Sequence, residues 1–455
     1  LKQCGLQQLW PPLPQAPMVQ VEKNNLGVPL LGKRCSMPPL RPLFIVLLIQ
    51  GTAFATAMIP AFSLRFRELA VANGLDEAAT AASLGKFIAV RSVVEFAATP
   101  TLAFWSDRVG RRPVMLLCTF ALCLEFGLLA LSKSLLAFSA THIAFGLLAN
   151  ANGALESTCI ADATPPGALR AVAFGRFFTV IGVVMVMGPA IGGHLAAIDG
   201  RAPFAVASIC CMVSLLYMAS HLPEYYSKQD PGSSNSRASA SSVVKHLLVT
   251  SPSTVWYIGA SVLSSMGMGT FGSVQVLWLR NAFGWDGLEV GRFMSMQGLL
   301  VIVSQSVILP RLLKHLRGCE PMIAQMGLIV TAAKLVAYGL APTSLWLCAF
   351  QLSGVACTCA IAPLRSLCTR AVPESHQGAV TGLISGLSTA AQVIGSILGS
   401  QVFATSLRTG LHLSSALFAA AVCYCLAFTC VTHAAHVEKK AHPKQKEVPE
   451  LVSNT

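Results

Sequence analysis

Long apolar segments separated by short polar ones recur along the chain between residues 43 and 432. A helix that crosses a bilayer needs about 20 apolar residues. Runs of roughly this size without Asp, Glu, Lys or Arg occupy residues 43–64, 203–220, 254–279, 293–310, 341–364, 377–407 and 409–432. The strands of a membrane barrel would alternate apolar and polar residues instead. The pattern therefore predicts an all-α integral membrane protein.

Twelve transmembrane helices in two pseudo-symmetric six-helix halves account best for this pattern. A serine-rich stretch, residues 227–242, has the composition of a flexible linker and lies between the sixth and seventh segments. We expect a disordered leader (1–41), an N-terminal half (42–222), a linker (223–252), a C-terminal half (253–433) and a charged tail (434–455). Within the halves the spans are expected at about residues 43–64, 81–104, 113–131, 135–160, 177–198, 203–220, 254–279, 291–310, 321–340, 344–367, 378–406 and 411–432.

Composition supports a membrane protein and excludes a nucleic-acid-binding one. Of 455 residues, 54% are hydrophobic and 11% charged, whereas soluble domains carry about 25% charged residues. The net charge of +13 comes from basic residues in every second loop. This distribution indicates how the chain is oriented in the membrane and not a patch that binds a polyanion. The positive-inside rule then places both termini in the cytoplasm, and leaves open which membrane the chain occupies.

One of these loops, Ser-Asp-Arg-Val-Gly-Arg-Arg-Pro at residues 106–113, packs four charges and a glycine between two long apolar stretches, and we call it the latch loop. An arginine at the bilayer centre costs roughly 2.5–3.5 kcal/mol on the mildest scale. The loop is therefore expected at the cytoplasmic surface.

Ionisable residues inside predicted spans are costly and by default indicate a substrate or proton pathway. Arg91 and Glu95 are four residues apart in span 2 and can pair on one helical face. Glu95 is the first candidate for a proton-carrying carboxylate, with a purely structural ion pair as the alternative.

Glu125 in span 3 and Glu156 in span 4 are further candidates for the proton and substrate site, and His142 could relay protons or simply pack. If span 4 is one continuous helix, His142 and Glu156 share roughly one face. Lys334 in span 9 could attract an anionic solute or reach toward the membrane surface.

The latch loop resembles the signature between spans 2 and 3 of the major facilitator superfamily. Its matching residues are Asp107, Arg108, Gly110, Arg111 and Arg112, while Ala103 stands where that family has a glycine. Spans 4 and 5 resemble the tetracycline and multidrug proton antiporters of the superfamily through Ala161-Asp162-Ala163-Thr164, Arg170, and Gly188-Pro189-Ala190-Ile191-Gly192-Gly193.

This resemblance implies a cytoplasmic latch that breaks during alternating access, and a fifth span that seals the path between the halves. Asp107 is expected to cap a helix N-terminus of the opposite half, and Arg112 to pair with Asp162. Two positions depart from the pattern: His142 replaces an arginine, and Gln50 is the only polar residue comparable to the aspartate of span 1 in the tetracycline exporters. Proton symport and facilitated diffusion therefore stay open.

The predicted function is secondary active transport of a small organic solute, by proton antiport for export or organelle loading. A non-transporting receptor or scaffold is the alternative from another class. We expect no enzyme activity, no catalytic residues, no bound metal and no cofactor, with the proton gradient as the driving force. The expected partners are the solute, protons and the lipid bilayer, with the chain acting as a monomer and binding no nucleic acid.

Overall fold

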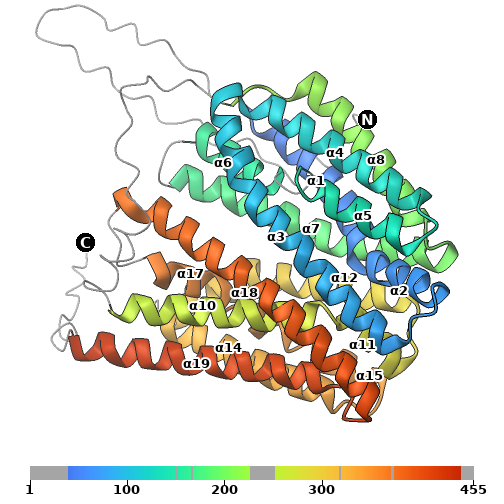
Figure 1. Ribbon diagram of the computed structural model, residues 1–455. Coiled ribbons are helices and arrows are strands. Elements are labelled where there is room, and N and C mark those ends of the chain that lie inside the picture. Colours follow the sequence, from blue (N-terminus) through green and yellow to red (C-terminus); the bar gives the residue numbers. More distant parts are fainter. Residues whose placement is uncertain are drawn as a thin grey trace, which may run out of the picture. The chain divides into compact units, whose positions relative to one another are not determined.

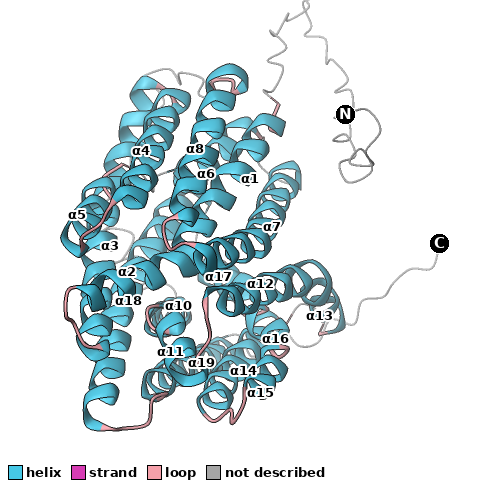
Figure 2. Ribbon diagram, turned by 90° about the vertical axis from the view of Figure 1, so that its right-hand side faces the viewer, coloured by secondary structure: helices cyan, strands magenta, loops and turns pink. Residues whose placement is uncertain are grey.

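The computed structural model describes residues 39–148, 152–164, 168–225, 252–316, 319–369 and 374–441, and within these ranges every regular element is a helix (Figure 2). The N-terminal half comprises α1 (Arg41–Thr56), η1 (Ala57–Ala61), α2 (Phe62–Ala72), α3 (Glu77–Val109), α4 (Arg111–Leu131), α5 (Leu135–Phe145), α6 (Asn152–Ala163), α7 (Ala168–Ile198) and α8 (Ala202–His221). The C-terminal half comprises α10 (Pro252–Gly272), α11 (Gln275–Phe283), α12 (Gly287–Val303), η3 (Ser304–Ile308), α13 (Leu309–His315), α14 (Glu320–Gly339), α15 (Ser344–Gln351), α16 (Gly354–Thr358), α17 (Ile361–Thr369), α18 (Glu374–Thr409) and α19 (Ser415–Ala441).

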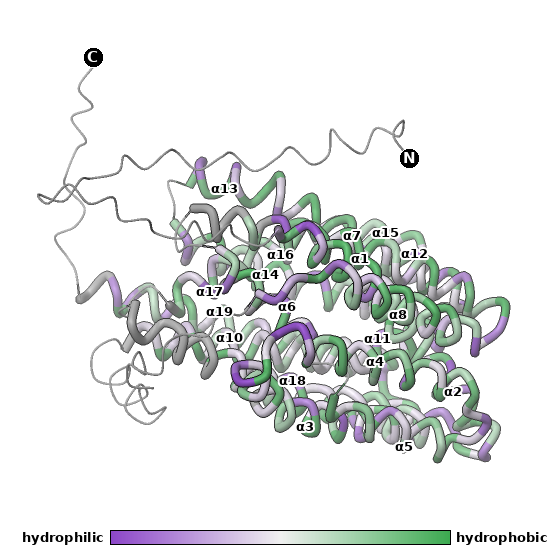
Figure 3. Tube along the Cα trace, turned by 90° about the horizontal axis from the view of Figure 1, so that it is seen from above, coloured by the Kyte–Doolittle hydropathy of each residue, from purple (hydrophilic) through white to green (hydrophobic). Residues whose placement is uncertain are grey.

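Among the described residues, nine helical segments are long and apolar enough to cross a membrane, or eleven if each bent pair is one span. The short apolar helix α5, together with α6, accounts for the remaining predicted span. Hydrophobic residues dominate the length of helices such as α7, α12 and α15 in Figure 3. The all-helical, twelve-span architecture predicted from the sequence is confirmed.

Several spans are broken where the sequence weakens the helical hydrogen-bond ladder. Pro60 lies in the π-helical turn η1, because proline lacks the N–H that would continue the ladder. Span 4 stops at Phe145 and resumes at Asn152, so the prediction of one continuous helix was wrong there, and with it the shared face of His142 and Glu156.

The ends of the spans also differ from the prediction. The last helix begins at Ser415 instead of residue 411 and runs on to Ala441, eight residues into the predicted tail. The leader up to residue 38, and residues 226–251 of the predicted linker, lie outside the described residues. The domain boundaries drawn from the sequence stay a prediction.

The two halves meet through two pairs of antiparallel helices (Figure 1). α7 packs along α12, and α3 packs along α18. Within the N-terminal half α1 contacts α7 and α8, and within the C-terminal half α10 contacts α18 and α19. One buried apolar cluster has members from both halves, among them Phe66, Phe87 and Trp278.

Candidate functional site

A buried charged cluster centres on Arg91 of α3. Its Nε donates to Glu95 Oε1 at 2.6 Å, one helical turn further on. The ion pair that the four-residue spacing predicted is therefore present. Arg91 is only 6% exposed, so the carboxylate offsets part of the cost of burying the guanidinium.

Two more helices complete this cluster. Arg91 Nη1 also donates to Glu125 of α4, and lies 2.7 Å from His142 Nδ1 of α5. His142 Nδ1 is in turn 2.6 Å from Glu125 Oε1. Sequence analysis named all four residues of this Arg91 cluster, but it could not bring them together because they come from three different helices.

Aromatic rings cover the histidine of the Arg91 cluster. The ring centroids of Phe62 and Phe87 lie 4.3 Å and 5.5 Å from that of His142. Glu125 has no exposed surface. The Arg91 cluster is thus shielded from water on this side.

Glu156 of α6 lies in different surroundings. It is 3% exposed, and its α6 neighbours Leu155, Cys159 and Ile160 belong to a buried apolar cluster. Among the described residues, no hydrogen bond or ion pair to the Glu156 carboxyl group is found. A buried carboxyl group without a cation is costly to hold in its charged form.

A chain of uncharged polar side chains begins one helical turn before Glu156. Asn152 Nδ2 donates to Thr119 Oγ1 at 3.4 Å, and Thr119 Oγ1 donates to Gln50 Oε1 at 3.3 Å. Asn152 Oδ1 is buried without a hydrogen bond in the part of the chain that the structure describes. Sequence analysis missed Thr119 and Asn152, because single amides and hydroxyls in a span carry no charge signal.

The latch loop is held together by Arg111. Its guanidinium pairs with Asp107 Oδ1 at 2.6 Å and with Asp162 Oδ2 of α6 at 3.1 Å. The predicted Arg112–Asp162 pair was therefore wrong by one residue. Consecutive residues at a helix start point about 100° apart, and Arg112 instead donates to the backbone carbonyl of Ala219 in α8.

Glu224, just after α8, caps the first turn of α4. Its carboxylate accepts hydrogen bonds from the backbone N–H groups of Arg111 and Arg112 at 2.8 Å and 3.1 Å, where a helix start favours negative charge. Gly110 has a φ of 114°, and a Cβ there would lie 2.7 Å from Glu224 Oε2. Both features require glycine at this position.

The other predicted latch residues are placed only in part. The Arg108 guanidinium lies 4.4 Å from the ring centroid of Phe104. The side chain of Arg170 lies outside the described residues, and so do residues 370–373, which precede α18. The capping of an opposite helix by Asp107 therefore stays a prediction.

The glycines of span 5 lie where α7 touches two other helices. A Cβ on Gly188 would overlap Ala55 of α1, and one on Gly192 would overlap the carbonyl oxygen of Thr56. A Cβ on Gly193 would overlap the carbonyl oxygen of Gly287 in α12. The close helix approach expected from these small residues is present, and α7 continues as a helix through Pro189.

The halves approach each other most closely at the end opposite the latch loop, which we call the closed end. Near it, Gly85 of α3 leaves no room for a Cβ against Ser400 of α18. Nearer the latch loop the same two helices meet through a long side chain, with the Phe96 ring 3.4 Å from the Cβ position of Gly386. The α3 and α18 backbones therefore diverge toward the latch loop.

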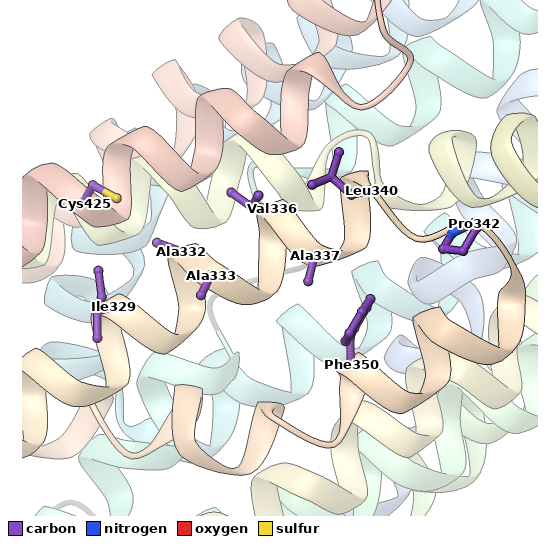
Figure 4. Close-up of a pocket in the computed structure, with 9 residues that line it drawn as sticks. All are labelled: Ile329, Ala332, Ala333, Val336, Ala337, Leu340, Pro342, Phe350 and Cys425. Atoms are coloured by element: carbon purple, nitrogen blue, oxygen red, sulfur yellow. The ribbon is translucent and has the colours of Figure 1, made fainter.

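An apolar pocket on the C-terminal half lies apart from these groups (Figure 4). It is formed by α14, the turn after it, α15 and α19, and its lining residues are Ile329, Ala332, Ala333, Val336, Ala337, Leu340, Pro342, Phe350 and Cys425. The lining contains no Asp, Glu, Lys, Arg or His, so it offers no charged partner for a charged solute.

Twelve spans in two halves, joined through two helix pairs and holding buried ionisable residues, define a polytopic membrane transporter. The chain belongs to the Major Facilitator Superfamily, whose family model matches residues 43–396. It is a transporter and not an enzyme.

Proteins with related sequences include tetracycline resistance proteins. The class D protein of Salmonella ordonez is 27% identical over 335 residues, which cover 72% of this chain and 82% of the relative. The class C protein of Escherichia coli is 27% identical over 361 residues, covering 76% and 86%.

Solved structures share the fold at lower identity. The human organic anion transporter MFSD10 (TETRAN) superposes with a TM-score of 0.63 at 20% identity, covering 87% of this chain and all of that one. A bacterial homolog of the human lysosomal transporter Spinster, in an inward-facing and unoccupied conformation, gives 0.68 at 14% identity, covering 88% and 97%. These likenesses show the fold alone.

Proposed function

We propose that this transporter moves a small organic solute by alternating access and exchanges it for protons. The similarity to tetracycline resistance proteins supports export or organelle loading as the direction. The charge distribution of the loops supports both termini being cytoplasmic. In this assignment the latch loop faces the cytoplasm and the closed end faces away from it.

The single observation that carries proton exchange is the isolation of Glu156. A buried carboxylate with no cation paired to it in the described structure is expected to hold a proton while it is shut off from water. Opening the surroundings to water would lower the free-energy cost of the charged form. The carboxyl group would then release that proton. Such a group links proton binding to the state of the transporter.

Glu156 is better suited to this task than Glu95 and Glu125. Both of those carboxylates contact the Arg91 guanidinium, so each already has a cation as its partner. Asn152 Oδ1, one turn from Glu156, is a buried acceptor for which the described residues supply no donor. When Glu156 is protonated, its O–H is a donor that lies within one helical turn of Asn152.

The test is solute flux in proteoliposomes that contain the purified full chain. A mixed panel of small organic solutes is offered under pH gradients of both signs. Antiport predicts accumulation only when the interior is acidic. Accumulation driven by an acidic exterior would instead establish symport, and equal flux under both gradients would establish facilitated diffusion.

Glu156→Gln should abolish the dependence on the pH gradient while leaving exchange of solute for solute intact, because the amide fills the same space and binds no proton. Glu68→Gln is the control and should keep the dependence on the pH gradient, since Glu68 is exposed and lies outside the Arg91 cluster. Gradient-driven accumulation that survives Glu156→Gln would rule out this carboxyl group as the carrier.

The latch and seal roles complete the proposal. The latch loop, with Asp107 and Arg111 at its centre, is proposed to hold the two halves together at its end of the molecule in the state opposite to the one described. The α7 segment with Gly188, Pro189, Gly192 and Gly193 is proposed to seal the path at the closed end. The tight contacts of these glycines with α1 and α12 support the second role.

A further inference from the structure

Lys334 of α14 is a cation without an anion in the C-terminal half. Between residues 321 and 364, which span two predicted transmembrane segments, it is the only Asp, Glu, Lys or Arg. Among the described residues, no hydrogen bond or ion pair to its ammonium group is found. The Tyr338 ring lies beside the ammonium group, with its centroid 5.4 Å from Nζ.

The position of the ammonium group is inside the protein and not toward lipid. A Cβ built on Gly354 of α16 would lie 3.8 Å from Lys334 Nζ, 3.9 Å from Gln351 Nε2 and 3.5 Å from Leu300 of α12. Side chains from three helices, α12, α14 and α15, therefore meet at the Cβ position of Gly354. One of them, α12, is the helix that packs along α7 of the other half.

Gln351 adds a second unsatisfied polar group at the same place. It is 1% exposed, and its Oε1 is buried without a hydrogen bond in the described structure. A carboxylate only accepts hydrogen bonds and cannot satisfy this oxygen, so the group of Gln351 that can serve an anion is the Nε2 donor. Gln351 Nε2 and Lys334 Nζ are two nitrogen donors that both lie near the Cβ position of Gly354. Because glycine has no side chain, this position is not filled by Gly354 itself.

The buried cation of the N-terminal half shows what this site lacks. There the buried cation, Arg91, is neutralised by Glu95 and Glu125 from its own half. In the C-terminal half a glutamine and a glycine stand beside the lysine, and they supply no negative charge. Lys334 is half-buried, and a cation held away from bulk water without a counter-charge is destabilised until an anion is supplied from outside.

We propose that Lys334 and Gln351 form a carboxylate-binding subsite above Gly354, which makes the transported solute an organic anion. The inference rests on the proposed function, because it names the chemical class of its solute. The ammonium group supplies the charge, the glutamine amide donates a second hydrogen bond, and Gly354 leaves the space for the carboxylate.

The test is ligand-induced thermal stabilisation of the purified full chain at constant ionic strength and pH. The probe is sodium benzoate, and the neutral amide benzamide, of nearly the same shape, is the reference. Wild type should be stabilised by benzoate and not by benzamide. Lys334→Gln should weaken benzoate binding about tenfold or more, and Lys334→Arg, which keeps the charge, should retain it.

Two further variants separate binding from mere structure. Gly354→Ala places a methyl group beside both donors. This methyl group would lie at ordinary contact distance from its neighbours, so the unliganded protein should unfold at an unchanged temperature. Benzoate binding should nevertheless be weakened, because the methyl group occupies the space next to the donors. Lys86→Gln removes an exposed lysine of α3 and should leave benzoate binding unchanged.

The proposal is overturned if benzoate and benzamide stabilise wild type equally, or if Lys334→Gln binds benzoate as wild type does. A lysine that only extends toward the membrane surface predicts this result. Flux of neutral or cationic solutes without benzoate binding would refute the subsite and keep the proposed function. Benzoate binding that depends on Lys334, without gradient-driven flux of any solute, would refute the proposed function and keep the subsite.

Discussion

Arg91 is the residue on which most of the buried charge in the N-terminal half depends. It contacts Glu95 on its own helix, and Glu125 and His142 on two others. Removing one member of such a network costs more than removing the whole network, because the remaining charges stay buried without a partner. The Arg91 cluster is therefore a structural requirement as well as a candidate for function.

Arg91→Met should lower the stability of the protein by about 3–5 kcal/mol, because Glu95 and Glu125 lose their cation. The measurement is the thermal unfolding midpoint in detergent. Lys86→Met, on an exposed position of the same helix, is the control and should change the midpoint little.

The double variant Arg91→Met with Glu125→Met provides a sharper check of the Arg91 cluster. It should be less destabilised than Arg91→Met alone, since one of the two unpaired carboxylates is gone. A double variant that is destabilised by the sum of the two single effects would show that the residues do not act together.

Helices set the distances within which these side chains act. α7 can approach both α1 and α12 closely because Gly188, Gly192 and Gly193 have no side chains. α4 begins at Arg111 because Gly110 adopts a positive φ and Glu224 accepts hydrogen bonds from the first free N–H groups of the helix. Each of these features belongs to a whole helix end or face and not to one residue.

Gly193→Ala should disfavour the closed end by about 1–3 kcal/mol, because the added methyl group meets the backbone of α12. Solute flux in proteoliposomes should fall by at least a few fold. Gly259→Ala in α10 is the matched control, because no atom lies within 4 Å of the Cβ it would introduce. Equal flux in both variants would remove the sealing role from this segment.

At the scale of the whole molecule, the two halves are joined most tightly at the closed end, where α7 meets α12 and α3 meets α18. In this state Asp107 pairs with Arg111 of its own loop. Alternating access requires the opposite contact, in which the latch end closes and the other end opens. A ligand or proton can drive this change only through a difference in its affinity for the two states.

Asp107→Asn should lower turnover while leaving folding intact, because the variant loses the charge that the proposed latch uses but keeps the size of the side chain. Turnover is measured as solute flux at equal amounts of reconstituted protein, and folding as the unfolding midpoint. Wild-type flux from the variant would refute the latch role of Asp107.

The sequence by itself determined the class of fold and much of the candidate chemistry. Apolar length fixes the spans because the bilayer sets how many residues must be apolar. A spacing of four residues fixes the Arg91–Glu95 pair because that spacing is a property of every α-helix. The latch loop and the span 5 glycines were likewise visible as motifs, without their partners.

Only the tertiary structure decided which residues meet across helices. Glu125 and His142 lie 34 and 51 residues from Arg91 along the chain, and Asp162 selects Arg111 over its neighbour through the direction in which each side chain leaves α4. The break in span 4, which separates His142 from Glu156, was equally hidden. Helix periodicity orders residues along one helix, but packing alone sets the rotation and depth of each helix against the next.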